Sequence, residues 1–172
     1  YLTNADGTYV DGSFREGHNV FTNYGRAWLS NLIRWSLVGD LAAINDVQTT
    51  GDRLRWISVG SGSQEELVGV QRLVTPLSIL TGPTVYLGAL GTRSFPTNNA
   101  IRHVRAFSGT DFAHLGASVT VAEAGLFVDQ DTGGGPALDV AIGTHPPVAY
   151  ITLPPLTKLA AQTLTVTWEF RF

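Results

Sequence analysis

The last ten residues, TLTVTWEFRF, carry the clearest alternation of apolar and polar side chains in the chain. The apolar positions are Leu164, Val166, Trp168, Phe170 and Phe172. Because successive side chains of a strand point to opposite faces, this pattern predicts a half-buried strand. We expect its apolar face to be covered by an opposite sheet, or by a helix face that carries Trp28 and Leu32.

A second region has apolar residues at helical spacing. In NYGRAWLSNLIRWSLVGD these positions are Trp28, Leu29, Leu32, Ile33 and Leu37. Thr22 or Asn23 can cap the start of such a helix, and Gly39 can end it in a left-handed conformation. The pattern predicts a helix over about 22–38, with a shorter helical or turn segment around LAAIND.

The remaining pattern consists of short β segments separated by Gly and Pro. The strand candidates are LRWISVGSG, TVYLGALGT, AIRHVRAFS, ASVTVAEAGLFVD with a break near Gly125, LDVAIGTH and VAYITLPP. A loop is expected at QDTGGGPA, and Pro146-Pro147 and Pro154-Pro155 punctuate the last third. These features predict a mainly β chain, an antiparallel β-sandwich or jelly-roll-like domain with one N-terminal α-helix.

The first twenty residues differ from the rest of the chain, since Gly, Asp and Asn recur there among few apolar side chains. They predict an extended arm or loose hairpin over 1–20 rather than a core element, followed by a single β-sandwich domain with an early helix over 21–172. A length of 172 residues fits one domain.

Composition excludes several classes. With no Cys, neither a disulfide framework nor a thiolate nucleophile exists, and a net charge of −3 argues against nucleic acid as a partner. No apolar run reaches membrane-spanning length, and the polar start lacks a signal-peptide core, so we expect neither a membrane association nor classical secretion. Among eleven basic residues only Lys158 is a lysine, which either broad subunit contacts or host codon usage would explain.

Candidate chemistry is sparse, and we expect no catalytic residues, no metal and no cofactor. The histidines His18, His103, His114 and His145 share no metal-ligand spacing. Ser61 and Ser63 fit a turn better than a nucleophile, and DQDTGGG lacks the later ligands of a calcium loop.

Glu123 is the exception, because an apolar strand tolerates a carboxylate only when it is paired. Its partner could be Lys158, Arg102 or Arg105. We favour a structural role, as a buried ion pair or a hydrogen-bond hub that fixes a bend at Gly125, over a catalytic acid.

Three stretches taken in order resemble small virion structural proteins of tailed bacteriophages. They are NYGRAWLSNLIRW, similar to an N-x-G-R-x-x-L-x-x-L helix; RWISVGSGSQEELVGVQRLVTPL, with I-x-x-G-x-G; and VAEAGLFVDQDTGG together with LPPLTKLAAQTLTVTWEF, with E-A-G-L-F and a closing strand. The ordered set covers about residues 20–172.

The resemblance implies a non-enzymatic component of the virion, on the capsid surface or the tail. The function that the resemblance favours is that of a capsid decoration (cement) protein bound to the major capsid protein. Such a protein would be a homo-oligomer, with a trimer favoured. A tail fibre, collar or baseplate adaptor that binds tail or neck proteins is the alternative, and a carbohydrate-binding β-sandwich module is a third. Side chains whose chemistry is favoured at interfaces are Tyr1, Tyr9, Phe14, Arg15, Arg93, Phe95 and Arg102.

Overall fold

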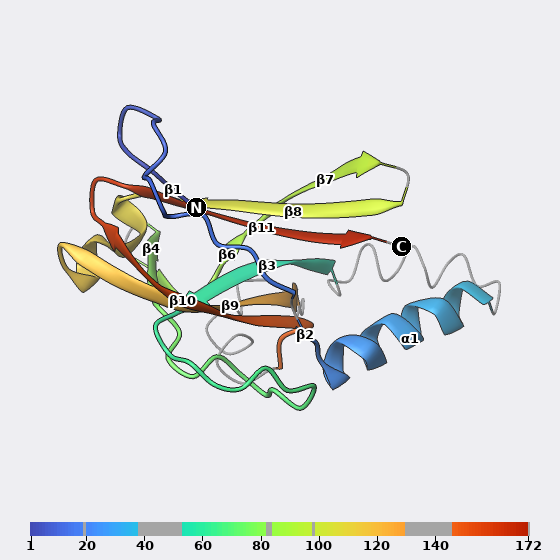
Figure 1. Cartoon of the computed structure of the whole chain (residues 1–172). Helices are drawn as coiled ribbons and strands as arrows, with labels where there is room; N and C mark the ends of the chain where they lie inside the picture. The colour runs from blue at the N-terminus through green and yellow to red at the C-terminus, as the bar shows by residue number, and fades with distance from the viewer. Residues whose placement is uncertain (19, 38–52, 82–83, 98, 130–145, 172) are drawn as a thin grey trace.

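The computed structural model in Figure 1 describes residues 1–18, 20–37, 53–81, 84–97, 99–129 and 146–171. Over these residues the chain is mainly β with two larger antiparallel sheets, which confirms the expectation of a mainly β chain. Neither of the helices in these ranges is long and apolar enough to span a membrane. The predicted LAAIND segment, the QDTGGGPA loop and the LDVAIGTH strand lie outside the described residues.

The two larger sheets are built from strands that are distant in sequence. The four-stranded sheet has the order β1 (Leu2–Thr3), β11 (Thr163–Arg171), β8 (Ala100–Phe107) and β7 (Thr92–Thr97). The five-stranded sheet has the order β2 (Val20–Phe21), β10 (Ala149–Leu159), β9 (Ser118–Asp129), β3 (Arg53–Gly60) and β6 (Ala89–Leu90). A small pair, β4 (Ile79–Thr81) and β5 (Thr84–Tyr86), and the 3-10 helix η1 (Thr110–Leu115) complete the β region.

One hydrophobic cluster takes side chains from both larger sheets. Leu164 and Trp168 of β11 are buried in it together with Ile57 of β3 and Leu126 of β9. The five-stranded sheet therefore covers the apolar face of β11. This confirms the first of the two covers expected from the sequence, an opposite sheet rather than the helix face. Burial of these faces provides the main stabilisation, at about 25 cal/mol per Å2 of apolar surface.

Strand β9 lacks the predicted interruption, and strand β10 is longer than its sequence predicted. The expected break near Gly125 is wrong, because β9 continues through it and pairs Gly125 with both Ser58 and Tyr150. The glycine instead makes room, since an added Cβ would lie 2.7 Å from the Phe127 ring. Strand β10 likewise runs through Pro154-Pro155, and its register with β9 shifts at that point, which accommodates residues that cannot donate to a ladder.

The predicted helix is present as α1 (Asn23–Leu37), and the structure selects Thr22 as its cap. The Thr22 hydroxyl accepts a hydrogen bond from the Gly25 amide at 3.1 Å and donates to the Pro147 carbonyl. The Asn23 amide donates to the Val68 carbonyl at 2.6 Å. Capping thus fastens the start of α1 both to the segment before β10 and to the loop over residues 61–78.

The first eighteen residues fold back on themselves and join the four-stranded sheet. Leu2 pairs with Leu164, and Thr3 pairs with both Thr163 and Tyr9 around a turn at Gly7, whose φ is +84°. Leu2 is buried in the main cluster. The expectation that this segment holds no core residue is therefore wrong at Leu2, an isolated apolar residue with no periodic pattern around it.

Candidate functional site

Glu123 is fully buried on β9, and its carboxylate is the centre of a hydrogen-bond hub. It accepts hydrogen bonds from the Val74 amide at 3.0 Å, the Thr75 amide at 2.9 Å and the Tyr150 hydroxyl at 3.0 Å. Burial and the adjacent Glu123 carboxylate raise the pKa of Tyr150, so its hydroxyl stays a donor. The expected hydrogen-bond hub is confirmed, but it holds Val74 and Thr75 and fixes no bend at Gly125, through which β9 continues.

The cationic partners suggested for Glu123 are wrong. Arg102 and Arg105 lie on β8 of the other sheet, where they pair with Glu169 and Asp111. The Lys158 ammonium donates to the Leu159 carbonyl and lies over the Phe112 ring. Backbone amides stabilise the buried carboxylate instead. No sequence pattern predicts which amides these are.

The glycines of VGSG explain how the loop over residues 61–78 reaches Glu123. A Cβ at Gly60 would lie 2.6 Å from the Thr75 carbonyl oxygen, and one at Gly62 would lie 2.9 Å from a Glu123 oxygen. Both positions therefore need glycine for close approach. The I-x-x-G-x-G and E-A-G-L-F stretches, far apart in sequence, form one structural unit in space.

A second carboxylate fastens the same loop from the opposite direction. Glu66 in the loop accepts hydrogen bonds from the Thr152 amide at 2.6 Å and from the Thr152 hydroxyl at 2.9 Å. Between these two attachments the loop exposes the aliphatic side chains of Leu67, Val68 and Val74. The loop is thus held by the buried Glu123 carboxylate and by the partly buried Glu66 contacts, while part of its apolar surface faces solvent.

The histidines do not converge on a metal or catalytic site in the described part of the chain. His18 is exposed, His103 is buried and the His114 Nε2 lies 2.8 Å from the Ser78 hydroxyl, while His145 is outside the described residues. No group of three potential metal ligands occurs among the residues that the structure describes. Ser61 is exposed, and its amide donates to the Thr75 carbonyl across the loop.

His103 and Lys158 are buried ionisable groups with shifted pKa values. Burial and then the nearby Arg93 guanidinium lower the pKa of His103 to about 4, so the imidazole is neutral at pH 7. Burial lowers the pKa of Lys158, and Asp111 partly opposes that shift. Both side chains are buried in the interior.

Four of the predicted interface residues lie together in the N-terminal hairpin, which we define as residues 1–18. Tyr9 and Phe14 are 71% and 66% exposed, and the Tyr1 and Tyr9 ring centroids are 5.1 Å apart. Arg15 donates to the carbonyls of Gly12 and Phe14, which stiffens the second turn. The hairpin thus presents aromatic side chains on a well-defined backbone.

The other three predicted residues lie at the far end of the same sheet. The Arg93 guanidinium lies 5.3 Å from the centroid of the Phe95 ring, which is 65% exposed. Arg102 on β8 forms an ion pair with Glu169 on β11. Arg93 is opposite the buried His103 in the register, whereas Arg102 is opposite Glu169, so the two arginines lie on different faces of the sheet.

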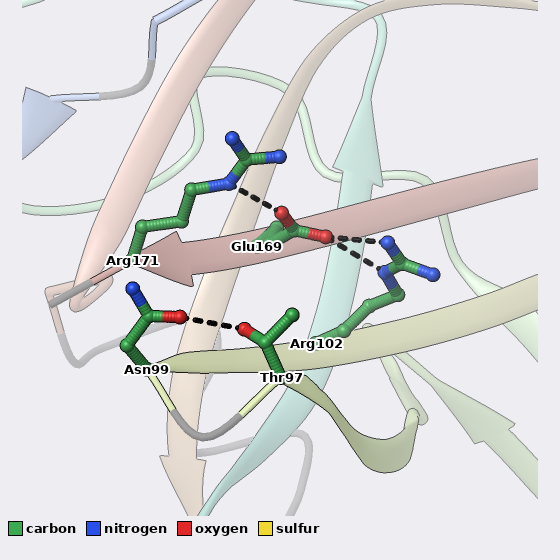
Figure 2. A network of polar contacts seen from close by, with 5 residues as sticks. All are labelled: Thr97, Asn99, Arg102, Glu169 and Arg171. Carbon is green, nitrogen blue, oxygen red and sulfur yellow. Dashed lines mark hydrogen bonds and ion pairs between the residues drawn. The ribbon is translucent and has the colours of Figure 1, made fainter.

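Glu169 and Arg171 form a polar network with Arg102 and are absent from the sequence-based selection. Figure 2 shows the Glu169 carboxylate between two guanidiniums: Arg102 donates from Nε at 2.9 Å and from Nη2 at 2.6 Å, and Arg171 donates from Nε at 2.7 Å. These hydrogen bonds, from Arg171 first and Arg102 second, lower the pKa of Glu169. The E-F-R spacing puts Glu169 and Arg171 on one face, but the cross-strand register with Arg102 cannot be read from sequence.

No protein-family model, curated protein or solved structure matches the chain.

Proposed function

We propose that this chain is a non-enzymatic structural component of a tailed-phage virion, built as a β-sandwich. The first assignment is a capsid decoration protein that stabilises the shell through contacts between subunits. The ordered motifs support the assignment, and the arrangement of the sheets supports the sandwich: both larger sheets contribute to one cluster in which Trp168 and Leu126 are buried together.

The observation that carries the proposal is the division between buried and exposed chemistry. The buried carboxylate of Glu123 is engaged by three donors that hold a loop in place, whereas exposed aromatic and Arg side chains gather at both ends of one sheet. Aromatic and Arg side chains are the types enriched in protein–protein interfaces. A chain with this division is suited to assembly.

The test is to locate the protein on particles of the phage that encodes it. Immunogold labelling of purified virions should mark the capsid surface, and particles that lack the protein should release their DNA at a lower temperature than complete particles. Label confined to the tail would replace the first assignment with the fibre, collar or baseplate alternative. Absence from the virions would overturn the proposal.

A further inference from the structure

We infer that β11 binds an extended acidic segment of a partner protein, which adds to the edge of the four-stranded sheet as one more antiparallel strand. The inference deepens the proposed function and rests on it for the setting, since it names a surface through which the chain would be held on the virion. The occupant is a segment of another protein rather than a second copy of this chain. The backbone of β11, the form of the other sheet edges and the side chains on both faces support this choice.

On the side away from β8, the backbone of β11 is paired only at its start. There the Thr165 amide donates to the Tyr1 carbonyl at 2.9 Å, and the Thr165 carbonyl accepts from the Tyr1 amino group at 3.1 Å. Because strand residues bond to their two neighbours alternately, the backbone groups of Thr167, Glu169 and Arg171 point to the same side. No described residue forms a hydrogen bond with them there. We call this row of backbone groups the open edge, and at about 3.3 Å per residue it is roughly 13 Å long.

The other edges of the two larger sheets have features that prevent the addition of a strand. Strands β1, β2 and β6 are each two residues long. Strand β7 is longer, but it contains Pro96, which has no N–H, and its register with β8 shifts between Ser94 and Thr97. Short strands, prolines and irregular registers are common means by which proteins avoid pairing between edges.

Strand β11 has none of these features along the open edge. Its register with β8 is unbroken from Leu164 to Arg171, and the stretch contains no proline. Figure 1 shows β11 beside β8, with β1 next to its start only. An edge that is long, regular and unguarded is a template for another strand. Every pair in the two larger sheets is antiparallel, so we assign that direction to the added strand.

On the inner face of the sheet the open edge offers apolar surface. Phe170 packs partly buried against the main cluster, and its ring meets that of Phe21 on β2 edge-on, with centroids 6.1 Å apart. A residue directly opposite Phe170 on an added strand would project to the same face. An apolar side chain at that position would cover the part of Phe170 that remains exposed.

On the outer face the same edge is positively charged. The Glu169 carboxylate engages Nε and Nη2 of Arg102 and Nε of Arg171, so both terminal nitrogens of Arg171 are not used by it (Figure 2). Two guanidiniums and one carboxylate give +2 − 1 = +1. A guanidinium fork suits a carboxylate, and the restraint by Glu169 reduces the conformational entropy lost on binding. The added strand should therefore carry Asp or Glu opposite Arg171.

A second copy of the chain fits the open edge less well. When two copies pair along the whole edge about a twofold axis, position 167 lies opposite 171 and Glu169 of each copy lies opposite Glu169 of the other. Like charges directly opposite destabilise a strand pair. A register shifted by two residues avoids this repulsion, but it pairs only positions 169 and 171 and still joins two surfaces of charge +1.

Hydrogen exchange tests whether the edge is open and whether the virion occupies it. In the isolated chain, the amides of residues 167, 169 and 171 should exchange at least about hundredfold faster than those of residues 166, 168 and 170, which face β8. Two-dimensional NMR resolves these amides singly. On virions, mass spectrometry of peptides that contain β11 should show uptake of three fewer deuterons than in the isolated chain, one for each amide of the open edge.

A synthetic strand tests the same edge without the virion. The probe is the heptapeptide VEVTVTV, blocked at both ends, whose antiparallel register puts Glu opposite Arg171 and Val opposite Phe170. In an NMR titration it should shift and protect the amides of residues 167, 169 and 171. The matched peptide VKVTVTV should bind at least about tenfold more weakly at low salt, and the difference should shrink as salt screens the charges.

Variants separate the backbone contribution from the charge. T167P removes one edge donor that does not face β8, whereas T167V keeps it. R171E reverses the exposed guanidinium, and R72E does the same in the loop over residues 61–78. The dissociation constant for particles that lack the protein should rise at least about tenfold for T167P and R171E and stay unchanged for T167V and R72E, with circular dichroism to establish folding. If T167P does not fold, R171E and the exchange data decide.

Three results would overturn the inference: an open edge that is already protected in the isolated monomer, equal binding of the two peptides, or equal exchange on and off the virion. Protection that grows with the concentration of the isolated chain would also overturn it, because a second copy would then occupy the edge. A chain located on virions with an unprotected edge would refute the added strand alone. A chain that binds the acidic peptide at this edge but is absent from virions would refute the proposed function alone.

Discussion

Glu123 and Glu169 each accept hydrogen bonds from three donor atoms, yet the two carboxylates have different roles. Glu123 is fully buried, and its donors are two backbone amides and the Tyr150 hydroxyl. Glu169 lies on the outer face of β11, and its donors are the flexible guanidinium groups of Arg102 and Arg171. The inner carboxylate fixes the backbone of a loop, whereas the outer one only arranges side chains.

The difference follows from solvent access. When a buried network loses one partner, the remaining groups cannot turn to water, and each unsatisfied group costs about 1–3 kcal/mol. The same loss at the surface is compensated by hydration. Burial therefore separates a network that the fold requires from one that is available to a partner.

Removal of residues 168–172 should have the largest effect, because it takes out the inner Trp168 and the outer Glu169 at once. Strand β11 lies between β1 and β8, and loss of the buried Trp168 alone would cost about 3–5 kcal/mol, a large part of the roughly 5–15 kcal/mol by which domains are stable. We expect no folded protein by circular dichroism or two-dimensional NMR. R171Q, which removes only one exposed guanidinium, should remain folded, and a folded truncated chain would mean that β11 is not essential.

The direct comparison is E123Q against E169Q. Glutamine at position 123 keeps the shape but turns one acceptor into a donor that faces other donors, which should cost about 2–3 kcal/mol. For a chain of this size that is a fall of roughly 5–10 °C in the midpoint of thermal unfolding. E169Q should leave the midpoint unchanged and alter only the salt dependence of binding to particles. Equal midpoints for the two variants would remove the distinction between them.

The buried imidazole of His103 should make the free energy of unfolding depend on pH. The pKa of His103 is about 4 in the folded chain and about 6.5 in an unfolded one, so the unfolded state binds more protons between these values. The free energy of unfolding should therefore fall as the pH decreases from 6.5 towards 4, by up to about 3 kcal/mol. Chemical denaturation at pH 6.5 and 5 measures the slope before the carboxylates titrate. H103L should flatten it, while H114Q, at a histidine that is not buried, should not.

Y150F should give the smallest of these effects, because Glu123 keeps both backbone donors. Loss of one hydrogen bond to a charged acceptor should cost about 1–2 kcal/mol. Urea unfolding would measure this change, with Y9F as the control at an exposed tyrosine. A loss as large as that of E123Q would mean that the hydroxyl, rather than the backbone amides, is the main partner of the carboxylate.

Sequence patterns predict the elements whose signals are local. The alternation of TLTVTWEFRF and the helical spacing after Thr22 each reflect one element against the core, so β11 and α1 match their predictions. Pro154-Pro155 predicts an interruption because prolines cannot donate to a ladder. The shift in register between β10 and β9 accommodates them instead.

The polar networks depend on tertiary placement and are predictable only in part. A carboxylate inside an apolar strand indicates that Glu123 must be paired, but its two backbone donors lie in an irregular loop some fifty residues earlier in the chain. The Arg102–Glu169 pair requires the register between β8 and β11, which sequence alone does not determine. Aromatic and Arg chemistry does select side chains that the fold gathers at two ends of one sheet.

The burial of Lys158 makes this chain unusual as a substrate for amine chemistry. It is the only lysine, and its side chain is 1% exposed. Acylating reagents and lysine-directed crosslinkers should therefore leave the side chains of the native protein unmodified, so the rate at which Lys158 reacts would report how often this part of the core opens.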